Sequence, residues 1–145
     1  MSDSGSPAAN KEIVSLLHDH LWRHADTGIL DDVVAPDAVT HWTGSDGSTI
    51  DAVRTDVQRY HAGFSDVYTR IDELVAEEDK VVLRWTTSGN HTGSYGRIAP
   101  TGRLITMTGV DIYRLAGGRI VEAWSMWDAL DVYQQLGLVE GDIGP

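Results

Sequence analysis

The chain has 145 residues, which is long enough for one domain with a sizeable hydrophobic core. It carries 11 basic and 22 acidic residues, and the net charge of -11 opposes binding to nucleic acid or to anionic lipid. It contains no cysteine, which excludes disulfides, thiol catalysis and zinc thiolate sites and favours a cytoplasmic location. No apolar run approaches the roughly 20 residues of a membrane helix, so we expect neither a nucleic acid nor a membrane as partner.

We expect a single domain over residues 10–138, flanked by flexible tails at residues 1–9 and 139–145. The first tail is small and polar, and the second is acidic and contains glycine. The polar start also lacks the basic and apolar regions of a secretory signal. Between the tails we find no internal repeat and no linker.

Helical spacing dominates the first half of this domain. Apolar residues recur with a period of 3.6 from Ile13 to Leu21, and Asn10 can cap this helix. Gly28 allows a second short helix over residues 29–34, which Ala35-Pro36 ends. The elements that follow are a short strand over residues 38–42, a turn at TGSDGS and a helix over residues 49–64.

The second half alternates as strands do. The predicted strands are residues 68–76, 81–91, 104–115 and 119–127, and a last helix covers residues 128–136. The polar run at residues 77–80 and the tight turn at residues 116–118 join strands as hairpins, and residues 93–102 form a loop. Helices followed by a meander of long strands predict an α+β domain. In it, a conical, curved antiparallel β-sheet wraps around the N-terminal helices and leaves a central pocket.

Three stretches carry a resemblance to a known family, namely VAPDAVTHW, RWTTSGNHTGSYGRIAPTGRLITMTGVDIYR and GGRIVEAWSMWDALDVYQQLG. They resemble the SnoaL-like polyketide cyclases and the related ester cyclases of the ketosteroid-isomerase-like (nuclear transport factor 2-like) superfamily, over residues 11–138. The resemblance implies acid–base chemistry on a hydrophobic, polyketide-like intermediate of secondary metabolism, as in antibiotic biosynthesis. It also implies that no metal or organic cofactor is needed, and that the chain forms a homodimer.

Strand parity sorts the side chains of the last strand. Val121, Ala123, Ser125 and Trp127 share one face, and Glu122, Trp124 and Met126 share the other. The resemblance implies that the Ser125 face lines the pocket and that the outer, Trp124 face meets a partner subunit. It also places the acid–base aspartate of the aldol-type cyclases where this chain has Ser125. A serine cannot easily take and return a proton near neutral pH, so the aldol mechanism in its family form is doubtful.

Asp111, on the preceding strand, is the leading candidate for general acid or base. If it points inward, desolvation raises its pKa towards a useful value; otherwise it pairs with Arg84 or Arg114 or faces solvent. His91 is the second candidate, because a neutral imidazole in reach of Asp111 could shuttle a proton. The alternative for His91 is a structural histidine bonded to the turn at residues 92–93.

Asp128 is a third catalytic candidate, although its position at a helix start, three residues before Asp131, is typical of an N-cap. Thr40 or His41 could bind an oxygen of the substrate, and tryptophans could form flat apolar walls or belong to the core. The candidate substrate contacts are Trp22, Thr40, His41, Trp85, Tyr95, Ser125 and Trp127.

Three functions remain open from the sequence. The first is a cofactor-free cyclase or isomerase that acts on a small hydrophobic substrate. The second is a hydrolase or hydratase on the same scaffold, of the kind that opens epoxides, in which the carboxylate activates water. The third is a domain that binds a small molecule without chemistry, which the serine at position 125 favours.

Overall fold

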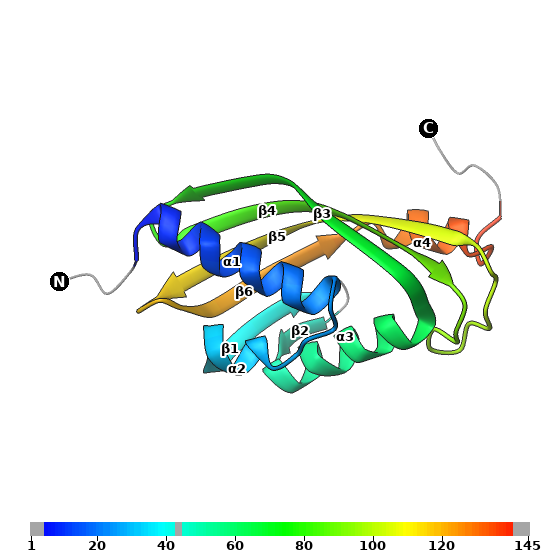
Figure 1. Cartoon of the computed structure of the whole chain (residues 1–145), viewed down its shortest axis with the longest axis horizontal. Helices are drawn as coiled ribbons and strands as arrows, with labels where there is room; N and C mark the ends of the chain where they lie inside the picture. The colour runs from blue at the N-terminus through cyan, green and yellow to red at the C-terminus, as the bar shows by residue number, and fades with distance from the viewer. Residues whose placement is uncertain (1–4, 43–44, 141–145) are drawn as a thin grey trace.

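A curved six-stranded sheet covers the helices in the computed structural model, which describes residues 5–42 and 45–140, with the backbone alone over residues 45–48. The helices are α1 (Pro7–Trp22), α2 (Ile29–Val33), α3 (Ile50–Gly63) and α4 (Ala129–Gln135). The strands are β1 (Val34–Trp42), β2 (Ser45–Ser48), β3 (Phe64–Glu77), β4 (Lys80–His91), β5 (Leu104–Ala116) and β6 (Arg119–Trp127). Helix α1 runs along β3 and β4, α3 contacts β1 and β3, and α4 packs on β5 (Figure 1). The predicted α+β architecture is confirmed.

The sheet has the order β2-β1-β6-β5-β4-β3, and all neighbours but one are antiparallel. The exception is the pair β1 and β6, which run parallel. A parallel pair needs a long crossover connection, and here α3 and the whole β3–β5 meander lie between the two strands. The antiparallel prediction therefore fails at this one pair, because alternation along a strand does not reveal its direction relative to a distant strand.

Helix α1 begins at Pro7, three residues before the predicted start at Asn10. The Ser6 side chain accepts a hydrogen bond from the Ala9 backbone N–H at 3.1 Å, so Ser6 is the N-cap and Pro7 stands in the first turn, where proline is favoured. Asn10 lies inside the helix with none of its surface exposed. Residues 7–9 are thus helical, although they were assigned to a tail.

Three further assignments differ from the prediction. Strand β1 begins at Val34, directly after α2, and the SDGS segment predicted as a turn forms β2 and pairs with β1. Pairing with β1 supplies backbone hydrogen bonds that this short polar segment lacks on its own. Strand β3 likewise begins at Phe64, immediately after α3, so no loop separates the helix from the sheet.

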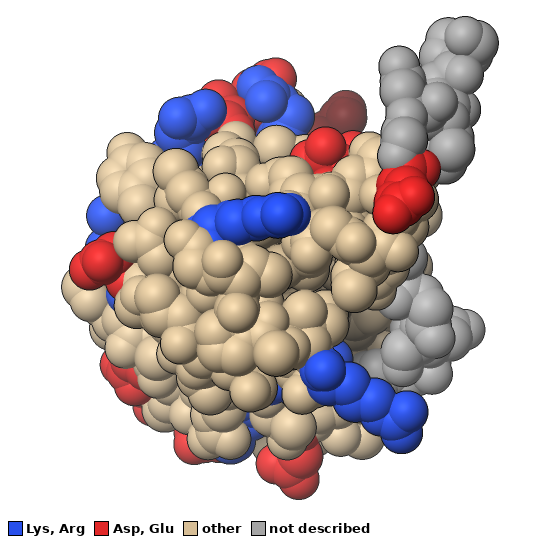
Figure 2. All heavy atoms as spheres, turned by 90° about the vertical axis from the view of Figure 1, so that its right-hand side faces the viewer, with Lys and Arg blue, Asp and Glu red and all other residues tan. Residues whose placement is uncertain are grey.

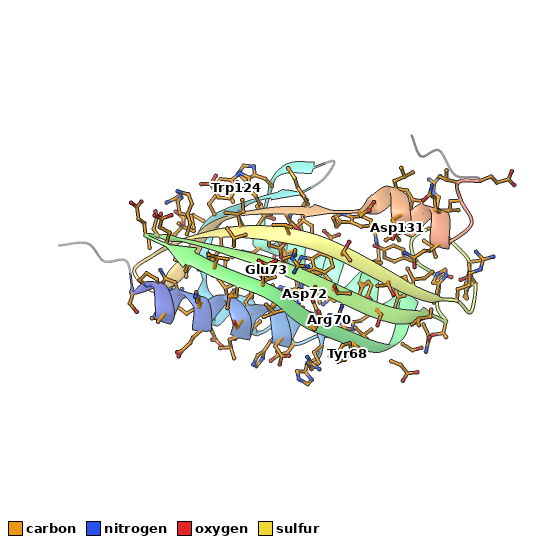
Figure 3. All side chains as sticks on the ribbon, turned by 90° about the horizontal axis from the view of Figure 1, so that it is seen from above. Tyr68, Arg70, Asp72, Glu73, Trp124 and Asp131 are labelled. Atoms are coloured by element: carbon orange, nitrogen blue, oxygen red, sulfur yellow. The ribbon has the colours of Figure 1, made fainter. Side chains whose placement is uncertain are left out.

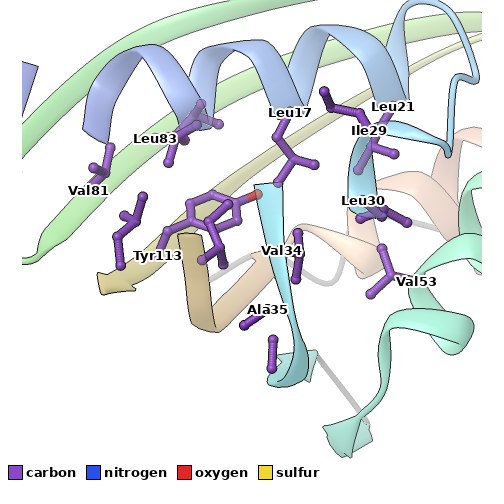
Figure 4. Packing of buried hydrophobic residues seen from close by; sticks show 14 of the residues in the cluster. Leu17, Leu21, Ile29, Leu30, Val34, Ala35, Val53, Val81, Leu83 and Tyr113 are labelled. Carbon is purple, nitrogen blue, oxygen red and sulfur yellow. The ribbon is translucent and has the colours of Figure 1, made fainter. Parts of the chain in front are cut away.

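The main core lies between α1, α2 and the concave face of the sheet. Leu17 and Leu21 on α1 face Leu30 and Val34 below them, with Tyr113 of β5 alongside (Figure 4). These side chains are at least nine-tenths buried, and full burial of each leucine contributes roughly 2 kcal/mol. The spacing of α1 residues at 14, 17 and 21 explains why this helix face turns towards the sheet.

The convex face of the sheet is polar along its edge strand. Tyr68, Arg70, Asp72 and Glu73 follow one another along β3, whereas Trp124 lies on β6 across the sheet (Figure 3). Arg70 is 2.7 Å from Asp72, and charged side chains on an edge strand discourage further strand pairing. Within the described residues, no helix is long and apolar enough to cross a membrane.

Candidate active site

A cavity of about 470 Å³ lies between the concave face of the sheet and the helices. Its lining combines apolar side chains from α1, α2 and α3 with the inward residues of β4, β5 and β6. Figure 2 looks at the end of the molecule that carries α4, where charged side chains are sparse over much of the described surface. A concave, largely apolar cavity with few polar groups is typical of small-molecule sites.

Asp111 lies in the wall of this cavity and is only 5% exposed. Three side chains donate hydrogen bonds to its carboxylate: Ser125 Oγ to Oδ1 at 2.7 Å, Trp85 Nε1 to Oδ1 at 3.1 Å, and Tyr113 Oη to Oδ2 at 3.1 Å. Oδ1 therefore accepts two hydrogen bonds and Oδ2 accepts one. Since a carboxylate can accept about four, Oδ2 retains a position for a further donor.

Burial raises the pKa of Asp111 to about 6, against the lowering effect of the hydrogen bonds from Ser125, Trp85 and Tyr113. No basic side chain forms an ion pair with Asp111 in the described part of the chain. The two arginines considered as partners are engaged elsewhere, because Arg84 pairs with Glu73 at 2.8 Å and Arg114 pairs with Glu122 at 3.1 Å. A carboxyl group with a pKa near neutrality can exchange protons efficiently.

Ser125 stands directly opposite Asp111 in the pairing of β5 with β6. Directly opposed residues on one face have their Cβ atoms about 5 Å apart, which explains the short hydrogen bond. The same parity brings Ala123 and Trp127 to the cavity, but a register shift near Leu115 turns Ile120 inward instead of Val121. The serine is thus a hydrogen-bond donor to a carboxylate one strand away.

Tyr113 and His18 also belong to this site, and neither is among the site residues predicted from the sequence. Burial and the neighbouring Asp111 raise the pKa of Tyr113 far above its ordinary value, so the phenol stays protonated and donates. His18 on α1 lines the cavity, and burial lowers its pKa to about 4. Its Nε2 lies 2.8 Å from Thr69 Oγ1. The signal that could have found His18 is its spacing, because it follows Val14 by four residues and precedes Leu21 by three, and both are buried.

His91 does not reach Asp111, contrary to the sequence-based hypothesis. Asp111 pairs with Leu83 across β4 and β5, and His91 lies eight residues further along β4 at the opposite end. At about 3.3 Å per residue the two positions are roughly 26 Å apart along the strand. His91 is fully buried, and its Nδ1 accepts a hydrogen bond from the Thr101 backbone N–H at 3.1 Å. Its contacts indicate a structural role at the base of the loop.

Asp128 caps α4, as the alternative interpretation held. Its Oδ1 accepts a hydrogen bond from the Asp131 backbone N–H at 3.0 Å, and its side chain does not line the cavity. His41 also lies outside, on the convex face, where its Nε2 is 2.9 Å from Glu122 Oε2 and its ring stacks on Trp124. The structure therefore places neither Asp128 nor His41 at the cavity.

The other predicted substrate contacts all line the cavity, namely Trp22, Thr40, Trp85, Tyr95, Ser125 and Trp127. Two charged residues of α3, Asp56 and Arg59, line it as well and were not predicted. The Arg59 guanidinium lies 5.5 Å from the centre of the Tyr95 ring, and burial raises the pKa of Asp56. Their helical pattern resembles an ordinary solvated face, so the sequence offered no signal for them.

The curved sheet encloses a cavity with a buried acid, Asp111, in its wall. These features are those of a small α+β protein with a concave ligand site. The sequence model of the SnoaL-like polyketide cyclases matches residues 12–136, so the chain belongs to this family. No protein of curated function matches the chain in sequence.

Solved structures of the same fold include several from this family. AclR of Streptomyces galilaeus, a proposed hydroxylase, is 25% identical, with 94% of this chain and 86% of that chain covered and a TM-score of 0.84. IdmH of Streptomyces antibioticus, a proposed polyketide cyclase, is 28% identical over 88% of this chain and 98% of its own, with a TM-score of 0.77. An epoxide hydrolase of Mycobacterium tuberculosis, 16% identical over 90% of each chain with a TM-score of 0.67, shares the fold.

Proposed function

We propose that the protein is a cofactor-independent cyclase or isomerase of secondary metabolism, with Asp111 as its general acid or base. The observation that carries the proposal is a carboxyl group in the wall of an apolar cavity with its pKa raised to about 6 and with no ion pair in the described part of the chain. Membership of the SnoaL-like family supports the same class of reaction.

The geometry of Asp111 suits transfer of a single proton. In a carbon–carbon closure, Oδ2 takes a proton from a carbon next to a carbonyl, and the resulting enolate attacks a second carbonyl within the same substrate. Asp111 then returns the proton to the new alkoxide, so the carboxylate is regenerated and no co-reactant is consumed. The donors Ser125, Trp85 and Tyr113 hold the carboxylate in place during both steps.

The shape of the cavity supports a hydrophobic, folded substrate. Trp22 and Trp127 offer flat walls, with Tyr60 edge-on to Trp22 at 5.8 Å between ring centres. An apolar enclosure of this kind can hold a flexible chain in a bent conformation, which brings the reacting carbons together and contributes to the rate.

Replacing Asp111 by Asn tests the proposal. We expect turnover to fall by at least ~100-fold, the lower end for loss of a general acid or base, while ligand binding is kept. Turnover is followed by mass spectrometry of the products formed from polyketide-like intermediates, and binding by quenching of tryptophan fluorescence. Asp128→Asn is the matched control, because it makes the same change outside the cavity and asparagine caps helices well. Equal turnover in Asp111→Asn and wild type would refute the role of Asp111.

A hydrolase or hydratase is the second candidate, because the free acceptor position on Oδ2 suits a water molecule as well as a substrate proton. Reaction in oxygen-18 water separates the two activities. Internal ring closure leaves the product without label, whereas addition of water introduces one labelled oxygen. A labelled product would replace the cyclase proposal with the hydrolase.

A domain that only binds its ligand is the third candidate. It predicts that Asp111→Asn and wild type both leave every ligand chemically unchanged. The absence of an ion pair at Asp111 within the described residues counts against it, because a buried carboxylate without a counter-charge destabilises the fold and such a cost is typical of functional sites.

A further inference from the structure

Gly109 and Trp85 face each other directly across β4 and β5. A Cβ atom built on Gly109 would lie 2.6 Å from Trp85 Cε2 and 2.7 Å from the Met126 carbonyl oxygen. Real Cβ atoms do not approach other atoms so closely, so the indole and the Met126 carbonyl together occupy the space that any side chain at position 109 would need. The glycine therefore lets the indole lie flat against β5.

This close approach determines where the indole N–H points. Asp111 is two residues beyond Gly109 on the same face of β5, and the Trp85 N–H donates to its Oδ1 at 3.1 Å. Two atoms of the indole lie next to position 109, Cζ2 and Cε2, and Cε2 is bonded to the Nε1 that donates to Asp111. Lifting the ring away from β5 would therefore carry the N–H away from Asp111.

We propose that Gly109 and Trp85 together act as positioning residues for Asp111, in which the missing side chain of the glycine lets the indole N–H hold Oδ1. Trp85 was expected to be a wall of the pocket, and this assignment gives it a polar task as well. The importance of this positioning for turnover rests on the proposed function of Asp111. The hydrogen bond from Trp85 to Asp111 can be tested without a substrate.

The side chains around the Asp111 carboxylate do not change their charge between about pH 5 and 8, so a titration in this range reports on Asp111. From its own strand Asp111 faces Tyr113, and from β6 it faces Ser125, which carries no charge. On α1, the His18 ring lies 6.2 Å from that of Trp85, and its low pKa of about 4 keeps it neutral above pH 5. Tyr113 stays protonated throughout this range.

Two other charged residues share the cavity lining, Asp56 and Arg59 on α3. Burial raises the pKa of Asp56, so this second carboxyl group has to be distinguished from Asp111 in a titration. Asp56→Asn removes this second carboxyl group and leaves Asp111 unchanged. An inflection that survives in Asp56→Asn and disappears in Asp111→Asn belongs to Asp111.

The experiment follows the indole N–H signals of the ligand-free protein by two-dimensional NMR between pH 4.5 and 8. Comparison with Trp85→Phe assigns the Trp85 signal among the five tryptophans. We expect this signal to shift with a midpoint near 6 and the shift to vanish in Asp111→Asn. In Trp85→Phe, the carboxyl ¹³C signal of Asp111 should titrate at higher pH than in wild type, because a donor that stabilises the charged form is gone.

Gly109→Ala should remove the inflection of the Trp85 signal, because the added methyl group displaces the indole. If Gly109→Ala alone does not fold, Gly109→Ala combined with Trp85→Leu should regain part of the lost stability, since the ring that the methyl group meets is absent. A Trp85 signal that ignores Asp111 in wild type, or keeps its inflection in folded Gly109→Ala, would overturn the assignment. Unchanged turnover in Asp111→Asn would instead refute the proposed function alone, so the two failures are distinguishable.

Discussion

Asp111 on β5 and Ser125 on β6 both face the cavity, so a carboxylate at either position would reach the same ligand. The resemblance to the aldol-type cyclases implies that their acid–base aspartate corresponds to Ser125, and the pairing of β5 with β6 puts Asp111 directly opposite that position. Opposed side chains on the same sheet face reach the same volume. An acid at either position can therefore act on a ligand in the cone, and the partner position is then free to supply a hydrogen-bond donor.

Asp111 should make the stability of the protein depend on pH. Its folded pKa of about 6 is above its ordinary value, so the folded state binds a proton more tightly than the unfolded chain does. The stabilisation from this proton is complete at pH values below the unfolded pKa and is lost as pH rises through about 6. The difference corresponds to roughly 3 kcal/mol of unfolding free energy. Asp111→Asn should therefore be more stable than wild type at pH 7.5 and similar to it at pH 4.

Urea denaturation at several pH values measures this difference. Asp128→Asn is the control, since it removes one negative charge from an acidic protein at an exposed helix cap. The advantage of Asp111→Asn over this control should grow between pH 4 and pH 7. An advantage that does not change with pH would mean that Asp111 titrates in the folded protein as it does in the unfolded chain.

At the scale of elements, the end of β4 organises the loop over residues 92–103. His91 donates its backbone N–H to Arg103 at 2.8 Å, and its carbonyl accepts from the Gly102 N–H at 2.8 Å. Its ring stacks on Phe64 at 5.1 Å between centres, and its Nδ1 accepts from the Thr101 N–H. His91→Leu would remove the acceptor of this last, part-buried N–H, and loss of such a hydrogen bond costs about 0.5–1.5 kcal/mol.

We expect His91→Leu to lower the free energy of unfolding by this amount and to speed hydrogen exchange at the Thr101 amide. The titration of Asp111 should not move, because Asp111 pairs with Leu83, which lies eight residues from His91 along β4. Asn90→Ala is the control, since residue 90 is the outward-facing neighbour on the same strand. A shifted Asp111 titration in His91→Leu would argue for the catalytic role that the sequence first suggested.

The sequence indicated which face of a strand a side chain lies on better than it indicated the distance between side chains on different strands. Alternation grouped Ser125 with Ala123 and Trp127 but left open whether Asp111 points inward, and the structure has both Asp111 and Ser125 in the cavity. The same alternation put His91 on that side, but parity does not tell how far along a strand a residue lies. The need for glycine at position 109 was also hidden, because it arises only when Trp85 of another strand is placed opposite.

The start of α1 carried a local signal in the sequence, although the prediction placed it at Asn10. Ser6 followed by Pro7 is a recognised start signal, and it competes with the weaker signal of Asn10. The parallel pairing of β1 with β6 was not readable, since it depends on how the whole meander closes. Local signals thus located the elements, and long-range pairing determined which side chains meet.

For the whole molecule, the sheet presents two different faces. The concave face holds the cavity, and the convex face carries a continuous apolar row that crosses four strands at Val75, Val82, Ile112 and Trp124. Val110 and Met126 form a second pair beside it, and Met126 is 71% exposed. Val75 and Val82 are exposed as well, whereas Ile112 and Trp124 are half-buried. Contiguous apolar residues at a surface are typical of protein–protein interfaces.

We propose that two copies of the chain associate through this convex face. One chain has a mass of 15.9 kDa, so sedimentation should give about twice that value for the wild type. Met126→Glu places a charge where the two copies would exclude water, and we expect the dimer to dissociate at least ~10-fold more readily, a cost of about 1.4 kcal/mol. Leu16→Glu is the matched control, because Leu16 is 45% exposed on α1, on the other side of the sheet. A monomeric wild type, or equal dissociation of the two variants, would assign the apolar row to another partner.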